Sequence, residues 1–197
     1  MSYSEYPFKF AKTILQQHFP EQYEDILQAI GALRTPLGRG VRPTPADALA
    51  ELLHQRGWQR EQPVTPSHSH LRFDLVKGAV AVEIQLSDPA DCYNDFLKFL
   101  LAHNLGLIAV GVEIVYDDSV GGRNIPRLSK VQRDLEVYRS VLACPVWVVG
   151  LKEATEQWVY SCGSDGDGTH LRADAPHGET GATGAERRAT HGTHAPD

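Results

Sequence analysis

The stretch that decides the fold is Arg72-Phe73-Asp74-Leu75-Val76-Lys77-Gly78-Ala79-Val80-Ala81-Val82-Glu83-Ile84-Gln85. Lys77-Gly78 separates two runs of mainly apolar, partly β-branched residues, which predicts two short strands joined by a tight turn. Asp74 belongs to the first strand. Side chains alternate along a strand, so Glu83 and Gln85 point to one face of the second strand while Val82, Ile84 and Leu86 point to the other. The stretch therefore predicts a β-hairpin that presents two carboxylates and an amide.

The segments around the hairpin alternate between helical and strand patterns. We expect helices at residues 7–19, from Pro20 to about Gly31, from a capping Thr44 to Gly57, at 90–104, and from a capping Ser129 to about Leu142. We expect strands or extended segments at 58–64, 107–116, 145–151 and 157–161. Among the residues expected to face the core are Phe10, Leu97, Tyr138 and Val141. This order predicts an α/β fold with a central mixed β-sheet flanked by helices.

Length and composition indicate one domain with a tail. The 197 residues are 42% hydrophobic, which suits an ordinary core. We expect one domain at 1–162 and a disordered tail at 163–197, because the tail is rich in Gly, Ala, Thr, His, Asp and Pro and has almost no large apolar residues. No apolar run is long enough to cross a membrane and no secretory signal is visible. Three widely spaced cysteines fit a reducing cytoplasm.

The charge of the chain does not settle whether it binds nucleic acid. The net charge of −6 argues against binding it, but half of that charge lies in the tail, and binding follows local potential. Residues 34–43 contain Arg34, Arg39 and Arg42 among glycines and prolines. This basic loop is either an arm that contacts a DNA backbone or a flexible basic linker.

Asp74 and Glu83 suggest a metal site if the hairpin brings them together. Two neighbouring carboxylates repel each other unless a cation lies between them, and such oxygen ligands suit Mg²⁺. Water bound to Mg²⁺ and facing a phosphodiester is the arrangement needed for hydrolysis. Taken alone, acids on a hairpin are more often solvated surface residues.

A resemblance to a known family favours the metal site over solvated surface residues. Phe73–Lys77 with Val80–Leu86 resembles the active-site hairpin of the BglII/BstYI group of type II restriction endonucleases, which belongs to the PD-(D/E)XK nuclease superfamily and has Gln where most members carry Lys. The likeness continues through residues 93–99, 110–114 and 146–151. It implies a restriction-endonuclease-like core in which Asp74 and Glu83 ligate Mg²⁺ with the backbone carbonyl of Ile84, and Gln85 helps to position the attacking water.

The resemblance also implies partners. Double-stranded DNA would be read by residues near the mouth of the sheet, for which the candidates are Ser87, Asp88, Arg123, Asn124, Arg127, Lys130, Arg34 and Arg39. Each of these could equally be a solvated loop residue. The helices at 90–104 and 129–142 would build a homodimer that matches the symmetry of a palindromic site. A cognate DNA methyltransferase would belong to the same system.

The sequence is therefore interpreted as a cytoplasmic, Mg²⁺-dependent type II restriction endonuclease that cuts both strands of a palindrome and leaves 5′-phosphate ends. Three alternatives stay open. The first is another PD-(D/E)XK nuclease with a repair or structure-selective role. The second is a catalytically inactive DNA-binding module. The third, favoured by the net charge, is an α/β binding protein unrelated to DNA.

Overall fold

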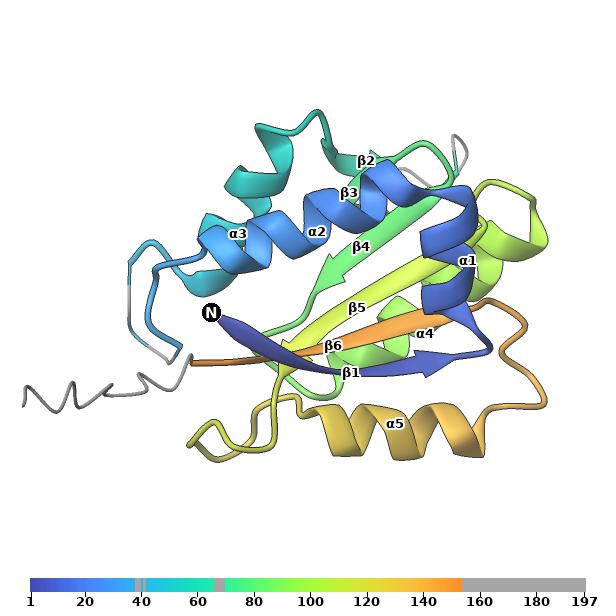
Figure 1. The fold of residues 1–197 in the computed structure, drawn as a ribbon. Coiled ribbons are helices and arrows are strands. Elements are labelled where there is room, and N and C mark those ends of the chain that lie inside the picture. Colours follow the sequence, from blue (N-terminus) through green and yellow to red (C-terminus); the bar gives the residue numbers. More distant parts are fainter. Residues whose placement is uncertain (38–39, 41, 66–69, 154–197) are drawn as a thin grey trace, which may run out of the picture. The chain divides into compact units, whose positions relative to one another are not determined.

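The computed structural model describes residues 1–37, 40, 42–65 and 70–153. In this part of the chain, strands form one mixed sheet in the order β1-β6-β5-β4-β3-β2 (Figure 1). The central strands β4, β5 and β6 are parallel, and the outer pairings are antiparallel. The strands are β1 (Ser2–Phe8), β2 (Gln59–Pro63), β3 (Arg72–Lys77), β4 (Val80–Ile84), β5 (Val110–Tyr116) and β6 (Val146–Lys152).

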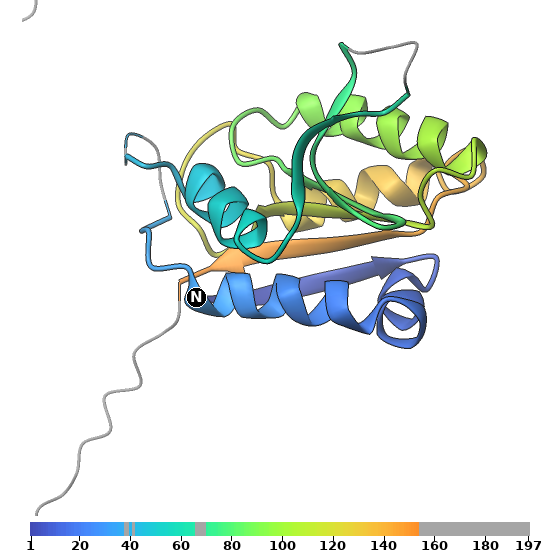
Figure 2. The ribbon, with the colours of Figure 1, turned by 90° about the horizontal axis from the view of Figure 1, so that it is seen from above.

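Helices cover both faces of the sheet (Figure 2). One apolar cluster joins one face to α1 (Ala11–His18), α2 (Pro20–Ala32) and α3 (Pro45–His54). A second cluster joins the other face to α4 (Asp91–Asn104) and α5 (Leu128–Val137). The predicted class, an α/β fold with a mixed sheet between helices, is confirmed. The described elements belong to one compact unit. The expected strand at 157–161 and the expected tail lie outside the described residues.

Local sequence signals explain the elements that were predicted well. Gly78 has a φ of +61°, a left-handed conformation that glycine adopts easily and that closes the β3–β4 turn. Thr44 and Asp47 form a reciprocal capping box at the start of α3, where Pro45 takes the first helical turn. No helix among the described residues is long and apolar enough to span a bilayer.

The N-terminal prediction is wrong. Residues 2–8 form β1, paired with β6, and α1 begins only at Ala11, so the expected helix from residue 7 is shorter than predicted. Phe10 does not face the core. It has a φ of 63° between strand and helix and is 80% exposed.

The core-facing assignments on the other side of the sheet also need correction. Helix α5 ends at Val137, so the helical spacing that placed Tyr138 and Val141 inward does not extend that far, and both are exposed. Leu97 is 64% exposed on α4. Ser129 does not cap α5: the capping position is Arg127, and the Ser129 hydroxyl donates to Asp118.

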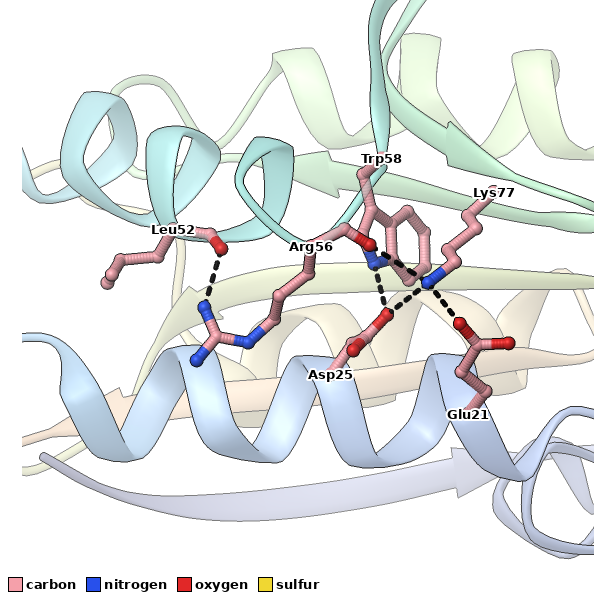
Figure 3. Close-up of polar contacts among 6 residues, drawn as sticks. All are labelled: Glu21, Asp25, Leu52, Arg56, Trp58 and Lys77. Atoms are coloured by element: carbon pink, nitrogen blue, oxygen red, sulfur yellow. Dashed lines mark hydrogen bonds and ion pairs between the residues drawn. The ribbon is translucent and has the colours of Figure 1, made fainter.

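A polar cluster holds the turn end of the hairpin against α2 and the segment after α3 (Figure 3). Lys77 Nζ donates to Asp25 Oδ2 at 2.8 Å, to Glu21 Oε1 at 2.7 Å and to the carbonyl of Arg56 at 2.9 Å. The indole of Trp58 donates to the same Asp25 oxygen at 3.0 Å. These contacts join α2, β3 and the segment after α3, and so fix the hairpin at the end away from Gln85.

Candidate active site

The opposite end of the hairpin forms a cavity of about 290 Å³ lined by Asp74, Glu83, Ile84, Gln85, Asp91, Asn94, Asp95 and Lys98. The predicted site residues Asp74, Glu83, Ile84 and Gln85 are therefore brought together. Asp74 Oδ2 accepts a hydrogen bond from the backbone N–H of Ile84 at 2.7 Å, which fixes one carboxylate beside the strand that carries the other. Glu83 is 3% exposed and faces α4, whereas Ile84 packs in the opposite core cluster.

Helix α4 adds two charged residues that were not assigned a role from the sequence. Lys98 Nζ lies 2.5 Å from Glu83 Oε1 and 2.8 Å from Asp95 Oδ1. Asp95 and Lys98 are three residues apart, a spacing that places them together on the helix surface. That spacing was the available sequence signal, but it does not reveal which strand the helix covers.

Glu113 on β5 is a third residue that sequence reasoning missed. It is paired in register with Glu83 on the neighbouring parallel strand and is fully buried. Neither of its carboxylate oxygens accepts a hydrogen bond from a nitrogen or oxygen donor among the described residues. The buried thiol of Cys92 lies against it. Glu113 lies in a run of otherwise apolar residues, so the sequence indicates a buried strand there and not an acidic site residue.

Burial and mutual repulsion shape the charges of the site. Burial, and then the negative charges of Asp95 and Asp74, raise the pKa of Glu83 well above its usual range, while Lys98 acts in the opposite direction. Burial likewise raises the pKa of Asp95 and, more strongly, of Glu113. Burial alone would lower the pKa of Lys98, but Glu83 and Asp95 outweigh it and raise that pKa. The site therefore holds more carboxyl groups than one lysine can neutralise, and burial and their mutual repulsion favour the protonated forms.

This donor set fits a hard divalent cation. Carboxylate oxygens are the preferred ligands of such ions, and an excess of buried acids is relieved when a cation binds. Within residues 1–37, 42–65 and 70–153, no three Asp, Glu, His or Cys side chains form a ready-made metal cage.

Gln85 connects the cavity to the next loop. Its Nε2 donates to the carbonyl of Asp88 at 2.9 Å, and its Oε1 accepts from the Ser87 hydroxyl at 3.3 Å. Ser87 and Asp88 are both exposed. The predicted recognition residues 87 and 88 thus lie beside the carboxylates, with Gln85 between them.

The other predicted DNA-contacting residues lie in several places. Arg123 and Asn124 are exposed in the loop after β5. The guanidinium of Arg127 donates to three carbonyls of that loop, at Asp118, Val120 and Gly122, so in this structure it shapes the loop. Lys130 forms an ion pair with Asp134 at 2.6 Å.

The basic loop is only partly described. Arg34 donates to the carbonyls of Gly31 and Leu33 at the end of α2, and Arg39 lies outside the described residues. Leu37 shares a cavity of about 230 Å³ with residues 119–121. Another cavity, of about 460 Å³, is lined by Gly40, the start of α3, residues 84 and 86–88, and Tyr116. The basic loop and both predicted recognition loops therefore meet at the carboxyl-end edge of the parallel strands.

Residues 3–151 match the protein family described as Restriction endonuclease BglII/BglIII. The chain belongs to this family. Two solved structures share the fold of this BglII/BglIII family member. BglII complexed with a DNA 16-mer aligns with a TM-score of 0.67 and 18% identity, over 79% of this chain and 78% of that one. Free BglII aligns with a TM-score of 0.60 and 19% identity, over 79% and 82%. A comparison with curated proteins gives no match.

Family membership confirms the resemblance, the fold and the enzyme class. This BglII/BglIII family member is a type II restriction endonuclease, a site-specific deoxyribonuclease that binds DNA. Membership also implies a requirement for a divalent metal. The roles of individual residues remain predictions.

Proposed function

We propose that the enzyme is a Mg²⁺-dependent homodimer that cuts both strands of a short palindrome and leaves 5′-phosphate ends. The observation that carries this proposal is the convergence of Asp74 and Glu83 in one cavity beside the exposed Ser87-Asp88 loop. Reading and cutting would then occur at the same edge of the sheet, where the carboxyl ends of parallel strands place ligand-binding loops.

We assign Asp74 and Glu83 as the side chains that hold Mg²⁺, with the carbonyl of Ile84. When bound, this ion would supply a water of lowered pKa and neutralise charge on the phosphate. Gln85 carries no charge and cannot accept the proton of that water as a base. Its role would be to orient the water and to hold residues 87 and 88, which it contacts.

Sequence reading is assigned to the loops at this edge. The exposed carboxylate of Asp88 suits the amino group of a cytosine, and Arg123 suits a guanine edge or a phosphate. Asn124, Lys130, Arg34 and Arg39 would contact phosphate or sugar. Arg127 would act indirectly, because its donors already stabilise the loop.

An exposed apolar groove supports the homodimer. Tyr93, Leu97, Tyr138 and Val141 are 37%, 64%, 44% and 63% exposed, and they line a cavity of about 370 Å³ between α4 and the segment after α5. Apolar patches of this kind mark protein interfaces. A two-fold dimer built there would present two active sites to the two strands of a palindrome.

Two further partners follow from the activity. An enzyme that cuts a short sequence would also cut the DNA of its own cell, so a cognate methyltransferase is expected. The cytoplasm is the compartment where incoming DNA would be met.

The test is digestion of plasmid DNA with Mg²⁺, followed by sequencing of the ends. Fixed bands with a common sequence at each 5′-phosphate end are expected. A smear would indicate a nuclease without a fixed site. Asp74→Ala and Glu83→Ala should abolish cleavage and keep specific DNA binding, whereas Glu24→Ala, an exposed acid of α2, should cleave like the wild type. Cleavage at the wild-type rate by either site variant would refute the assignment.

A further inference from the structure

Lys98 is the one cationic side chain among the residues that line the active-site cavity, where it faces four acids. Its ammonium forms ion pairs with Glu83 Oε1 at 2.5 Å and Asp95 Oδ1 at 2.8 Å, and it donates a hydrogen bond to the carbonyl of Arg72 at 3.1 Å. Its side chain is 14% exposed. This lysine therefore lies inside the site and is not a solvated residue at its rim.

The contact with Glu83 involves the carboxylate that we assign to the metal. A divalent cation and an ammonium repel each other. One carboxylate oxygen therefore cannot bind both of them tightly at the same time. Lysine carries a compact charge on a flexible four-carbon chain, so its ammonium moves readily over short distances. Asp95 and the Arg72 carbonyl give it a position inside the cavity that does not depend on Glu83.

Gln85 does not provide an alternative source of charge. Its amide is neutral, and its two ends are bonded to Asp88 and Ser87. The positive charge that the protein places in this cavity therefore comes from Lys98 on α4 and not from β4, the strand that carries Glu83.

We propose that Lys98 is a positioning residue that holds the place of the divalent cation at Glu83, and that metal binding displaces it from Glu83 onto Asp95. The inference rests on the proposed function for the assignment of Glu83 as a metal ligand. It adds that, in the absence of metal, the charge of Glu83 is balanced by a cation of the protein itself. Metal and lysine then compete for one carboxylate, and the lysine stays in the cavity after it has been displaced.

A purely structural role for Lys98 predicts the opposite effect on metal binding. If Lys98 only supports the shape of the site, removing it should loosen the carboxylates and weaken metal binding. If it competes with the metal, removing it should strengthen metal binding. The sign of the change separates the two roles without reference to DNA cleavage.

The experiment measures Mn²⁺ binding to DNA-free protein by electron paramagnetic resonance at about pH 8.5, where protons compete less with the metal. The variants are Lys98→Met, which keeps the length of the side chain, and Lys98→Gln, which remains useful if the methionine variant folds poorly. We expect about tenfold or greater tightening of the Kd for Mn²⁺. Mn²⁺ should also raise the Tm of the variants more than that of the wild type, because it replaces the missing cation.

The control is Lys12→Met, which removes the same charge from an ion pair with Glu5 between α1 and β1. Its Mn²⁺ affinity should equal that of the wild type. Unchanged or weaker Mn²⁺ binding in both Lys98 variants would overturn the proposal. Failure of the proposed function is a separate result: a wild-type protein that never cuts DNA would refute the nuclease assignment, and the binding data would still decide whether Lys98 competes with a cation.

Discussion

The clearest prediction about stability concerns Gly111 on β5. A Cβ atom at this position would lie 2.7, 2.8 and 3.0 Å from three ring carbons of Phe99 on α4. Phe99 has no exposed surface and stacks on Phe73 with ring centroids 5.8 Å apart, so its ring has no free space to enter. Gly111→Ala should therefore push α4 away from the sheet. Overpacking of this kind destabilises by about 1–3 kcal/mol, which for a domain of this size lowers Tm by roughly 2–10 °C.

The assay is urea denaturation with Gly31→Ala as the matched control. Gly31 lies in α2, and nothing comes within 4 Å of the place that an alanine methyl group would occupy, so alanine there should stabilise the protein by up to about 1 kcal/mol. Gly111→Ala combined with Phe99→Leu should lose less stability than the sum of the two single changes, because the smaller side chain relieves the clash. Strict additivity, or wild-type stability in Gly111→Ala, would refute the packing argument.

Three other predictions concern charge and assembly. Glu113 keeps its proton to higher pH in the folded protein than in the unfolded chain, so wild-type stability should fall as pH rises above the usual range of a glutamate. Glu113→Gln stays neutral, so urea denaturation in EDTA at about pH 6 and about pH 8.5 should show a smaller loss, and an equal loss would contradict the buried acid's role. Leu97→Glu places a charge in the exposed apolar groove and should give monomers in analytical ultracentrifugation; a dimer unaffected by this change and by Val141→Glu would place the interface elsewhere. Lys77→Met removes the cation bound to the largely buried Asp25 and should destabilise the protein by about 1–3 kcal/mol in thermal or urea unfolding, and a loss below about 0.5 kcal/mol would mean that this cluster does not anchor the hairpin.

The hairpin and the start of α3 could be predicted from the sequence because their signals are local. Gly78 supplies the turn, alternation places Glu83 opposite its apolar neighbours, and Thr44 caps α3 through a residue three positions away. The first strand could not be predicted in this way. Its partner is β6, with Ser2 opposite Lys152, and its residues are mostly half-buried, so the strand is defined by a pairing between distant ends of the described chain.

The grouping of the candidate site residues in one cavity could be predicted in part for the same reason. Asp74, Glu83 and Gln85 lie on one hairpin, so their spacing carries the information. Lys98 and Asp95 join them only because α4 packs over β4. Nothing in the sequence of the helix indicates which strand it covers. Glu113 reaches the site through the parallel pairing of β4 with β5, inside an apolar run that signals only a buried strand.

The hydrogen bonds of Gln85 bear on how enzymes of this kind acquire new target sequences. On the assignment proposed above, the loop that reads bases begins two residues after the last catalytic side chain. A change at Ser87 removes a partner of Gln85, and a shift of the backbone at Asp88 moves the carbonyl that Gln85 holds. Specificity and rate are thus tied together at this loop. The loop at 117–127 is held instead by hydrogen bonds from Arg127 to three of its own carbonyls. Divergence in the recognised sequence should therefore begin in the longer loop, where mutations alter reading and leave the cutting site undisturbed.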